Sequence, residues 1–317
     1  MAPCMAGELC VRQEQDHMTD GRKARHRYTR YHWAKSDRKN QGRIHLLEHH
    51  LADVGTCFEA LMRQPTIRKR LASTGGLNDL KESLVARLSV FAALHDIGKV
   101  NMGFQTQIWK PEELPGRRPM QFRRVGHTLD LTPVLTWKDE TTAAWFFDAL
   151  GWWYDATESW DDRGGETVCA MLVATLSHHG RPLRLEDSRS ENPAIWRKFG
   201  DLKPEDCVKR VGNLLRLWFP ARSRRGGSTR RAIPAFQHMF LGLCNWADWI
   251  GSNEEWFPYV DAPQDDYIKT ARKRAKQAVD AIGLDLSDQR RDFKRATEFR
   301  TLSVSLRRSP TPDTKTA

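Results

Sequence analysis

The sequence lacks the features that would assign it to a membrane-spanning, a secreted or a cysteine-based class of proteins. No apolar run reaches the roughly 18 residues that a membrane span needs, and the N-terminus has no apolar segment typical of a signal peptide. The six cysteines are scattered without a C-x-x-C pair, so each is most simply a small buried or surface residue. We therefore expect a cytoplasmic chain with no membrane partner, in which cysteine does not carry the chemistry.

Patterns typical of β-strands are also scarce, whereas apolar residues recur at steps of three and four along much of the chain. That spacing is typical of amphipathic helices, and the sequence shows no internal repeat. The expected fold class is therefore all-α, a helical bundle. The predicted helices cover 43–63, 79–97 (ended by Gly98), 166–179 (ended by Gly180), 233–250 (ended by Gly251) and 264–282.

The two ends of the chain differ from this middle part. Residues 1–30 are polar and basic without a hydrophobic period, which predicts a basic disordered extension. From about residue 284 the chain turns polar again, so 284–317 is expected to be a C-terminal tail. The folded domain is therefore predicted to span 31–283, and its proline-containing stretch 100–140 is expected to be loop with short helices.

The charge balance is strongly basic, with 51 Lys and Arg against 40 Asp and Glu and a formal net charge of +11. Such an excess suits a polyanionic partner, and nucleic acid is the commonest one. The plainer alternative is a basic surface that aids solubility. Clustering of the basic residues favours phosphate contacts over random decoration. The clusters are Arg22–Arg30, Arg222–Arg231 and Lys269–Lys276.

A histidine and an aspartate stand together near the end of the predicted helix 79–97. Its apolar stripe runs through Leu88 and Phe91, and a further step of four reaches His95, whose imidazole is therefore expected to face the core. The adjacent carboxylate of Asp96 is costly to bury unless it is paired, hydrogen-bonded or bound to a metal. For the pair alone, the simpler interpretation is a core histidine that caps its own helix end.

Further histidines lie at or beside the apolar faces of other predicted helices. His178 and His179 end the helix 166–179, where the negative end of the helix dipole favours a bound cation, although they could simply support that dipole. His50 borders an apolar stripe and is preferred over His49 by helical phase. Both His49 and His45 are expected on the solvent side. His127, in a less regular region, would by itself be a loop histidine.

Asp248 is the least ordinary of these residues, because it lies inside the most apolar segment of the chain. A solvated surface charge is implausible there, so the carboxylate needs a cation, a cluster of donors or a metal. Inward-facing His and Asp side chains from separate helices are how helical bundles build dinuclear metal sites. The whole set therefore predicts such a site in the core of the bundle.

This ordered set of residues resembles the HD metal-dependent phosphohydrolases. The resemblance is carried by His50 in Leu-Glu-His-His-Leu-Ala-Asp-Val, by Leu-His-Asp-Ile-Gly-Lys and by Leu-Ser-His-His-Gly. Two further segments are similar to the CRISPR-associated HD nuclease branch of type I interference, and the likeness spans roughly 32–260. They are Trp33-Ala34-Lys35-Ser36 and Ala247-Asp248-Trp249-Ile250-Gly251-Ser252-Asn253-Glu254.

The resemblance implies two divalent metal ions bridged by Asp96. Histidine-rich ligation suits Mn, Fe, Co or Ni better than Mg, which prefers oxygen ligands. Lys99 would contact a phosphate, and the alternative of a plain surface lysine stays open. By this likeness the first metal is held by His50, His95, Asp96 and Asp248, and the second by Asp96, His127, His178 and His179.

The resemblance also implies an activity and partners. The family's module cleaves single-stranded DNA in antiviral defence, beside or fused to a superfamily 2 helicase that acts with an RNA-guided surveillance complex. No G-x-x-x-x-G-K-[ST] motif occurs here, so the helicase is expected on a separate chain, unless the gene is truncated. The alternatives are an HD phosphohydrolase of small nucleotides, a non-enzymatic adaptor and a plain nucleic-acid-binding protein.

Overall fold

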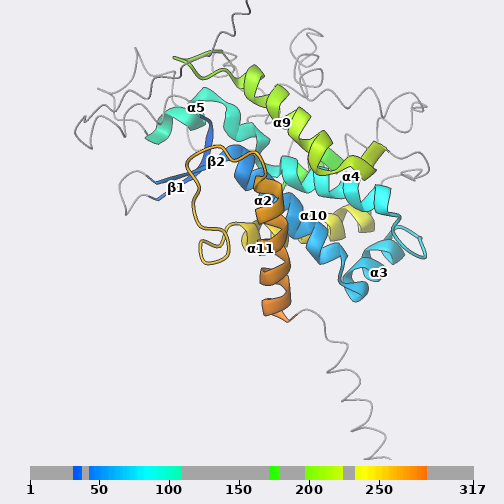
Figure 1. Cartoon of the computed structure of the whole chain (residues 1–317). Coiled ribbons are helices and arrows are strands. Elements are labelled where there is room, and N and C mark those ends of the chain that lie inside the picture. Colours follow the sequence, from blue (N-terminus) through cyan, green and yellow to red (C-terminus); the bar gives the residue numbers. More distant parts are fainter. Residues whose placement is uncertain (1–30, 38–42, 109–170, 179–196, 224–232, 284–317) are drawn as a thin grey trace, which may run out of the picture.

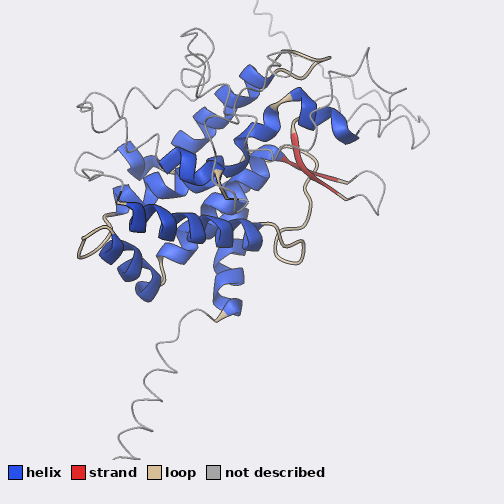
Figure 2. Ribbon diagram, turned by 180° about the vertical axis from the view of Figure 1, so that it is seen from behind, coloured by secondary structure: helices blue, strands red, loops and turns tan. Residues whose placement is uncertain are grey.

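The computed structural model describes residues 31–37, 43–108, 171–178, 197–223 and 233–283, and these are mostly helical, as expected. A two-stranded antiparallel sheet, which the sequence did not predict, precedes the first helix (Figure 2). Its strands are β1 (Trp33–Ser36) and β2 (Ile44–Leu46). The helices are α2 (Leu47–Met62), α3 (Pro65–Thr74), α4 (Glu82–Ala93), α5 (Met102–Gln105), α9 (Pro204–Trp218), α10 (Pro234–Gly251) and α11 (Tyr267–Ile282), with short 3-10 turns η1 (Leu94–Val100), η2 (Thr106–Ile108) and η8 (Pro220–Ser223).

Helix α2 lies at the centre of the bundle, where it packs against α4, α10 and α11 (Figure 1). Two glycines bring its neighbours close. A Cβ at Gly55 of α2 would lie 3.0 Å from the Cβ of Ala93, and one at Gly251 of α10 would lie 3.1 Å from Cγ2 of Val54. Because larger side chains would push these helices apart, the glycines fix the spacing between the elements that carry the site.

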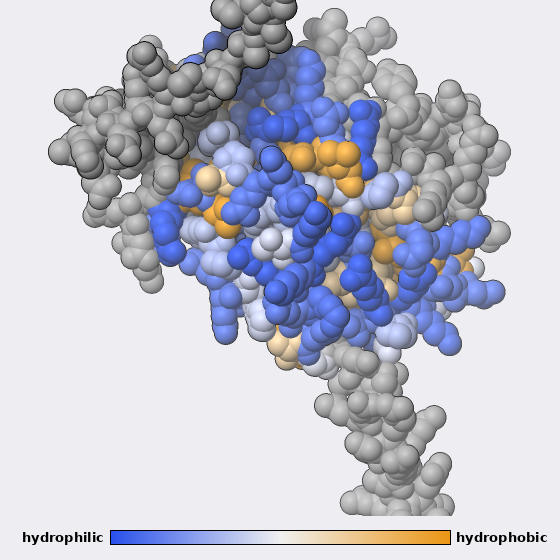
Figure 3. Space-filling view, viewed as in Figure 1, coloured by the Kyte–Doolittle hydropathy of each residue, from blue (hydrophilic) through white to orange (hydrophobic). Residues whose placement is uncertain are grey.

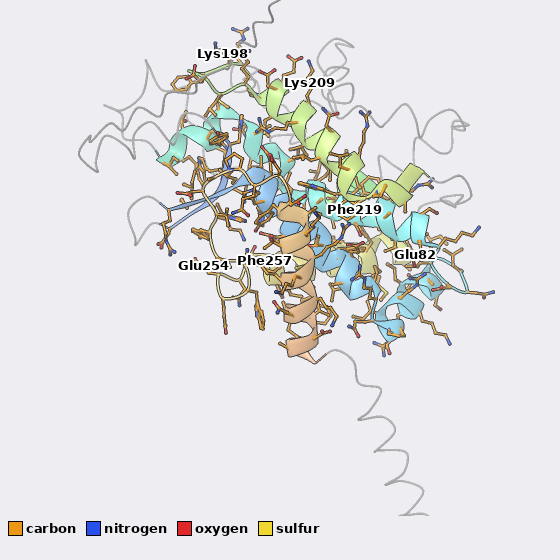
Figure 4. The ribbon with its side chains drawn as sticks, viewed as in Figure 1. Glu82, Lys198, Lys209, Phe219, Glu254 and Phe257 are labelled. Atoms are coloured by element: carbon orange, nitrogen blue, oxygen red, sulfur yellow. The ribbon has the colours of Figure 1, made fainter. Side chains whose placement is uncertain are left out.

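The apolar side chains that the helical spacing predicted form one main core. Phe219 and Phe257 are both 2% exposed, whereas the labelled Lys198 and Lys209 lie at the outer edge of the ribbon (Figure 4). The face seen in Figure 3 is largely hydrophilic, with hydrophobic residues confined to small patches. Among the described residues, none of the helices is long and apolar enough to cross a membrane.

The element boundaries correct one prediction in a way that matters for the site. The helix expected over 79–97 ends as an α-helix at Ala93, and Leu94–Val100 continue as a 3-10 turn. The reason is local: Asp96 has φ −113° and ψ 17°, which is not helical, so Gly98 is not where the helix ends. The chain therefore leaves the helical path at the histidine and aspartate themselves, in the sparsely populated region where many active-site residues lie.

The other predicted helices have counterparts in the structure. The helices expected over 43–63, 233–250 and 264–282 correspond to α2, α10 and α11. Of 166–179 only 171–178 is described, and it is helical over 171–176. Helices α3 and α9 were not predicted, although α9 buries Val208, Val211 and Leu215 along one face.

Candidate metal centre

Five His and Asp side chains from separate elements meet at one end of α2, and we call them the site cluster. Helix α2 supplies His50, the turn η1 supplies two residues, α10 supplies one, and the segment 171–178 supplies the last. The Nε2 atoms of His50 and His95 both lie 3.2 Å from Oδ2 of Asp96. The members are His50, His95, Asp96, His178 and Asp248.

Asp96 lies between the other members and presents its two oxygens to different sides. Oδ2 faces His50 and His95, whereas Oδ1 lies 3.6 Å from Nε2 of His178. The side chain is buried, so water does not compensate for its charge. This is the geometry that a carboxylate needs to bridge two cations.

Asp248 closes the cluster from α10. Its Oδ1 lies 3.4 Å from Nε2 of His95 and 3.7 Å from Nε2 of His50, and it accepts a hydrogen bond of 2.8 Å from Oγ of Ser252. Its side chain is 17% exposed, which leaves the cluster open to solvent on this side. The carboxylate of Asp248 therefore has the kind of polar partners that its place in an apolar helix predicted.

The hydrogen bonds of the histidines orient their rings for metal binding. Nδ1 of His95 donates to the carbonyl of Ala92 at 3.0 Å, and Nδ1 of His178 donates to the carbonyl of Thr175 at 3.1 Å. A ring that donates through Nδ1 to a backbone carbonyl presents the lone pair of Nε2 to a metal, which is the usual outer-shell arrangement. Both rings direct Nε2 toward Asp96.

Buried polar atoms without a hydrogen-bond partner also point to a bound cation. Among the described residues, Nε2 of His95 and Oδ1 of Asp96 are buried and accept or donate no hydrogen bond. Leaving such groups unsatisfied costs roughly 1–3 kcal/mol each, so a native structure needs a ligand there. Ligand atoms fall into two groups within 4.8 Å, His50 with His95 and Asp248, and His95 with Asp96 and His178. These residues fit a divalent metal.

The electrostatics keep the cluster in the charge state that attracts cations. Although burial acts in the opposite direction, the Lys99 ammonium and His95 hold the pKa of Asp96 well below its usual range. Burial lowers the pKa of His95, but the carboxylates of Asp96 and Asp248 outweigh it and raise that pKa to about 9. The imidazolium therefore neutralises part of the negative charge until a metal replaces its proton.

Lys99 is buried, so the alternative of a plain surface lysine is wrong. Its Nζ lies 2.6 Å from Oδ2 of Asp96 and donates to the carbonyl of Ala34 at 3.2 Å. The side chain is 6% exposed. Lys99 thus pairs with the central carboxylate and ties it to β1; a contact with phosphate stays a prediction.

A buried amide that the sequence did not single out positions this lysine. The side chain of Gln105 accepts a hydrogen bond from N of Trp33 at 3.0 Å and donates to O of Trp33 at 2.9 Å. The same amide nitrogen donates to the carbonyl of Lys99 at 2.6 Å. Gln105 therefore links β1 to the turn that carries His95 and Asp96, and no sequence pattern signalled it.

A second buried polar cluster adjoins the site cluster, and we call it the Asp53 cluster. Nε2 of His45 donates to Oδ2 of Asp53 at 2.8 Å, and the hydroxyl of Tyr267 donates to Oδ1 at 2.9 Å. The backbone N–H of Val260 donates to Nδ1 of His45 at 3.1 Å. Each side-chain polar atom of His45, Asp53 and Tyr267 is thus hydrogen-bonded.

This cluster corrects the expectation that His45 and His49 face solvent. His45, on β2, is 1% exposed and His49, on α2, is 4% exposed, because Tyr267 of α11 packs against both rings. The ring of His49 stacks on Tyr267 with centroids 3.9 Å apart. His50, one residue later, is therefore the histidine whose ring reaches Asp96.

Some of the expected site residues cannot be placed. His127 and His179, the remaining expected ligands, lie outside the described residues, as do the clusters Arg22–Arg30 and most of Arg222–Arg231. The cluster Lys269–Lys276 lies on α11, and part of it is engaged within the protein: Arg272 donates to Glu59 at 2.8 Å and Lys269 pairs with Asp266 at 2.7 Å. Its phosphate contacts stay a prediction.

Comparison with known proteins gives a family and a fold. The family model described as "Cas3, HD domain" matches residues 33–257. The CRISPR-associated endonuclease/helicase Cas3 of Thermus thermophilus is 26% identical over 273 residues, covering 82% of this chain and 26% of that protein. The protein of the same name from Escherichia coli is 26% identical over 290 residues, covering 81% and 30%. The chain thus spans less than a third of the length of these relatives.

Solved structures share the fold. The crystal structure of the Thermus thermophilus Cas3 HD domain in the presence of Ni²⁺ superposes with a TM-score of 0.51 at 20% identity, covering 82% of this chain and 91% of that one. The crystal structure of T. fusca Cas3–AMPPNP superposes with a TM-score of 0.53 at 20% identity, covering 81% of this chain and 27% of that one. At this identity the likeness concerns the fold alone.

Proposed function

The chain belongs to the Cas3 HD-domain family, and from that premise we propose that it is a metal-dependent endonuclease that cleaves phosphodiester bonds of single-stranded DNA in CRISPR antiviral defence. The observation that carries the proposal is the site cluster, in which buried His and Asp atoms converge on Asp96 without enough hydrogen bonds to satisfy them. Family membership supports phosphodiester cleavage as the reaction. The site cluster supports it further, because its side chains are those that bind divalent metals.

We propose that the site cluster holds two divalent transition-metal ions. Its donor set is richer in imidazole than in carboxylate, which suits Mn, Fe, Co or Ni better than Mg. The Cas3 HD domain of Thermus thermophilus was solved in the presence of Ni²⁺, which agrees with this choice. The proposed ligands are His50, His95, Asp96 and Asp248 for one ion, and Asp96, His127, His178 and His179 for the other.

The protein's own residues prepare the site for hydrolysis. When bound, the metal ions would supply a hydroxide near neutral pH and neutralise charge on the phosphoryl oxygens. Lys99 keeps Asp96 ionised and fixed in place, and the carbonyls of Ala92 and Thr175 hold the rings of His95 and His178 in the metal-binding orientation. These contacts orient the ligands before substrate arrives, which is the role of an outer shell.

We further propose that a superfamily 2 helicase delivers the DNA strand in the cytoplasm after an RNA-guided surveillance complex has opened the target. The curated relatives are named endonuclease/helicase, which supports a helicase as the partner of this domain. The proposed nuclease domain spans 31–283, which is supported by the family match over 33–257 and by the last described helix, α11.

Cleavage of circular single-stranded DNA tests the proposal, because a circle can be opened only by an endonuclease. The protein is stripped with chelator and resupplied with Mn²⁺, Co²⁺, Ni²⁺ or Mg²⁺. We expect cutting by wild type to return with the transition metals and to be lost in Asp96→Ala. The matched control, Asp265→Ala, removes an exposed aspartate and should cut like wild type.

Two outcomes would overturn the proposal. If wild type leaves the circle intact with every metal but hydrolyses free nucleotides, the chain is a small-molecule phosphohydrolase. If Asp96→Ala cuts as fast as wild type while remaining folded by circular dichroism, the cluster is not the catalytic centre.

A further inference from the structure

Lys99, which the likeness to HD nucleases associates with phosphate, already has partners within the protein. Lys99 directs its ammonium at Asp96, donates to the carbonyl of Ala34 and lies 5.4 Å from the ring centroid of Phe104. An ammonium has three N–H donors, and the ion pair with Asp96 at 2.6 Å uses one of them in a charge-assisted hydrogen bond. A phosphate that bound Lys99 would compete with the central carboxylate, so another cation is better placed for substrate.

Lys35 is the next residue along β1 from the carbonyl that accepts from Lys99. Strand β1 is irregular at this point: Trp33 pairs with Leu46 and Lys35 with His45, so Ala34 is an extra residue on one strand. Bulges of this kind redirect side chains and are common beside active sites. Because β1 also packs against the turn η1, Lys35 lies on a strand that contacts the turn carrying His95 and Asp96.

The Lys35 ammonium has surroundings that differ from those of the Lys99 ammonium. Among the described residues it forms neither a hydrogen bond nor an ion pair, although the residue is half-buried. Burial lowers its pKa to about 8, and the charges of Asp248, Lys99 and Asp96 are the next strongest influences. A cation withdrawn from water, with no counterion among the described residues, is positioned for an anionic ligand.

The net charge of the occupied site indicates which anion fits. Asp96 and Asp248 are the carboxylates of the cluster, and both are committed to its histidines and proposed metals. Two divalent ions together with Lys99 and Lys35 would leave the site strongly positive, so a ligand must bring negative charge. A DNA strand brings one such charge with every phosphate, and phosphate oxygens accept readily from an ammonium.

We propose that Lys35 binds a non-bridging oxygen of a backbone phosphate in the single strand that crosses the metal centre, while Lys99 holds Asp96. This inference rests on the proposed nuclease function and adds a substrate contact to it. Lys35 is therefore a substrate-binding residue, distinct from the metal ligands and from the buried Gln105 that positions Lys99.

Kinetics of Lys35→Met test the contact, with Lys35→Arg as the conservative variant and Lys69→Met as the control at an exposed lysine. We expect kcat/KM on a single-stranded oligonucleotide to fall about 10- to 100-fold in Lys35→Met, as for the loss of one charge-assisted hydrogen bond. Lys35→Arg should recover most of it. The salt dependence of log kcat/KM should flatten by about 0.7, the contribution of one phosphate contact to a single strand.

Oligonucleotides with one neutral methylphosphonate link identify the phosphate. When the neutral link replaces the phosphate that Lys35 contacts, kcat/KM of wild type should fall to the value that Lys35→Met has on the unmodified oligonucleotide. The same replacement should not lower kcat/KM of Lys35→Met any further. Additive losses at every position would overturn the assignment.

Stability separates a substrate contact from a structural role. Lys35→Met should be no less resistant to urea than wild type, and Mn²⁺ should stabilise both equally, because removing a half-buried cation without a partner relieves the folded state. If Lys35→Met is destabilised and Lys35→Arg restores it, the lysine is structural. If wild type cleaves DNA and Lys35→Met is equally active, this inference alone is overturned. If wild type itself is inactive, the proposed function is overturned as well.

Discussion

Two buried polar clusters share helix α2, and their hydrogen bonding differs. The Asp53 cluster is complete, since both oxygens of Asp53 and both ring nitrogens of His45 have partners between 2.8 and 3.1 Å. The site cluster, which begins three residues earlier at His50, leaves Nε2 of His95 and Oδ1 of Asp96 without a hydrogen bond among the described residues. Both clusters contain histidine and aspartate, so the presence of these residues does not distinguish them.

A structural polar cluster and a binding site differ in how completely their buried polar atoms are hydrogen-bonded. A complete set of hydrogen bonds removes the cost of burial and joins elements, here β2, α2 and α11. An incomplete set keeps that cost until a ligand supplies the missing partner. The Asp53 cluster should therefore matter for stability and the site cluster for function, and matched substitutions can test the comparison.

The largest effect is expected from Asp248→Asn, which keeps the shape of the side chain and removes its charge. Metal-dependent cleavage of single-stranded DNA should fall by about 10³-fold, because one anionic ligand is lost from a centre that depends on charge. The free energy of unfolding in chelator should change by about 1 kcal/mol or less. Initial rates and urea unfolding on the same preparation measure both quantities.

Asp53→Asn is the matched substitution in the other cluster and should show the opposite pattern. The amide would place its NH₂ group against a donor, either Nε2–H of His45 or the hydroxyl of Tyr267. His45 cannot easily change tautomer, because Val260 donates to its Nδ1. The free energy of unfolding should fall by about 2–3 kcal/mol. Equal loss of stability in Asp53→Asn and Asp248→Asn would break the comparison.

The pH dependence of stability gives a smaller, graded test of the complete cluster. Burial lowers the pKa of His45 from 6.5 to about 3 in the folded protein. As pH falls from about 6.5 toward 3, His45 is protonated in the unfolded chain but stays neutral in the folded chain. The free energy of unfolding therefore falls. One such group contributes about 1.4 kcal/mol per pH unit.

His45→Gln isolates this contribution, since glutamine can donate and accept in place of the ring. Burial also lowers the pKa of His32 and His49 to about 3 and lowers the pKa of His50, so His45 is one of several histidines that contribute to the wild-type slope between pH 6 and 4.5. In His45→Gln the slope measured in chelator should be shallower by one proton. An unchanged slope would mean that His45 is protonated in the folded protein.

Helical periodicity was sufficient to predict the bundle and to direct His50, His95 and Asp248 toward its interior. Asp248 stood out because it interrupts an apolar helix, and its burial against His95 follows from that helical phase. These predictions worked because the spacing of residues within one helix determines which of them share a face.

Other features depend on contacts between distant parts of the chain. His45 and His49 were expected in solvent, but α11, more than 200 residues later, covers them. The burial of Lys99 follows from β1 and from the amide of Gln105, neither of which leaves a periodic pattern. The non-helical backbone at Asp96 likewise serves the site and overrides the local helical spacing.

Metal-induced stabilisation tests the central claim most directly, that the incomplete cluster binds divalent metal and the complete one does not. Urea unfolding with and without Mn²⁺ would be compared for wild type, Asp53→Asn and Asp248→Asn. Wild type and Asp53→Asn should gain the same increment, about 2.7 kcal/mol at a metal concentration of 100 times Kd, and Asp248→Asn should gain little. An equal gain in Asp248→Asn, or a gain that disappears only in Asp53→Asn, would contradict the claim.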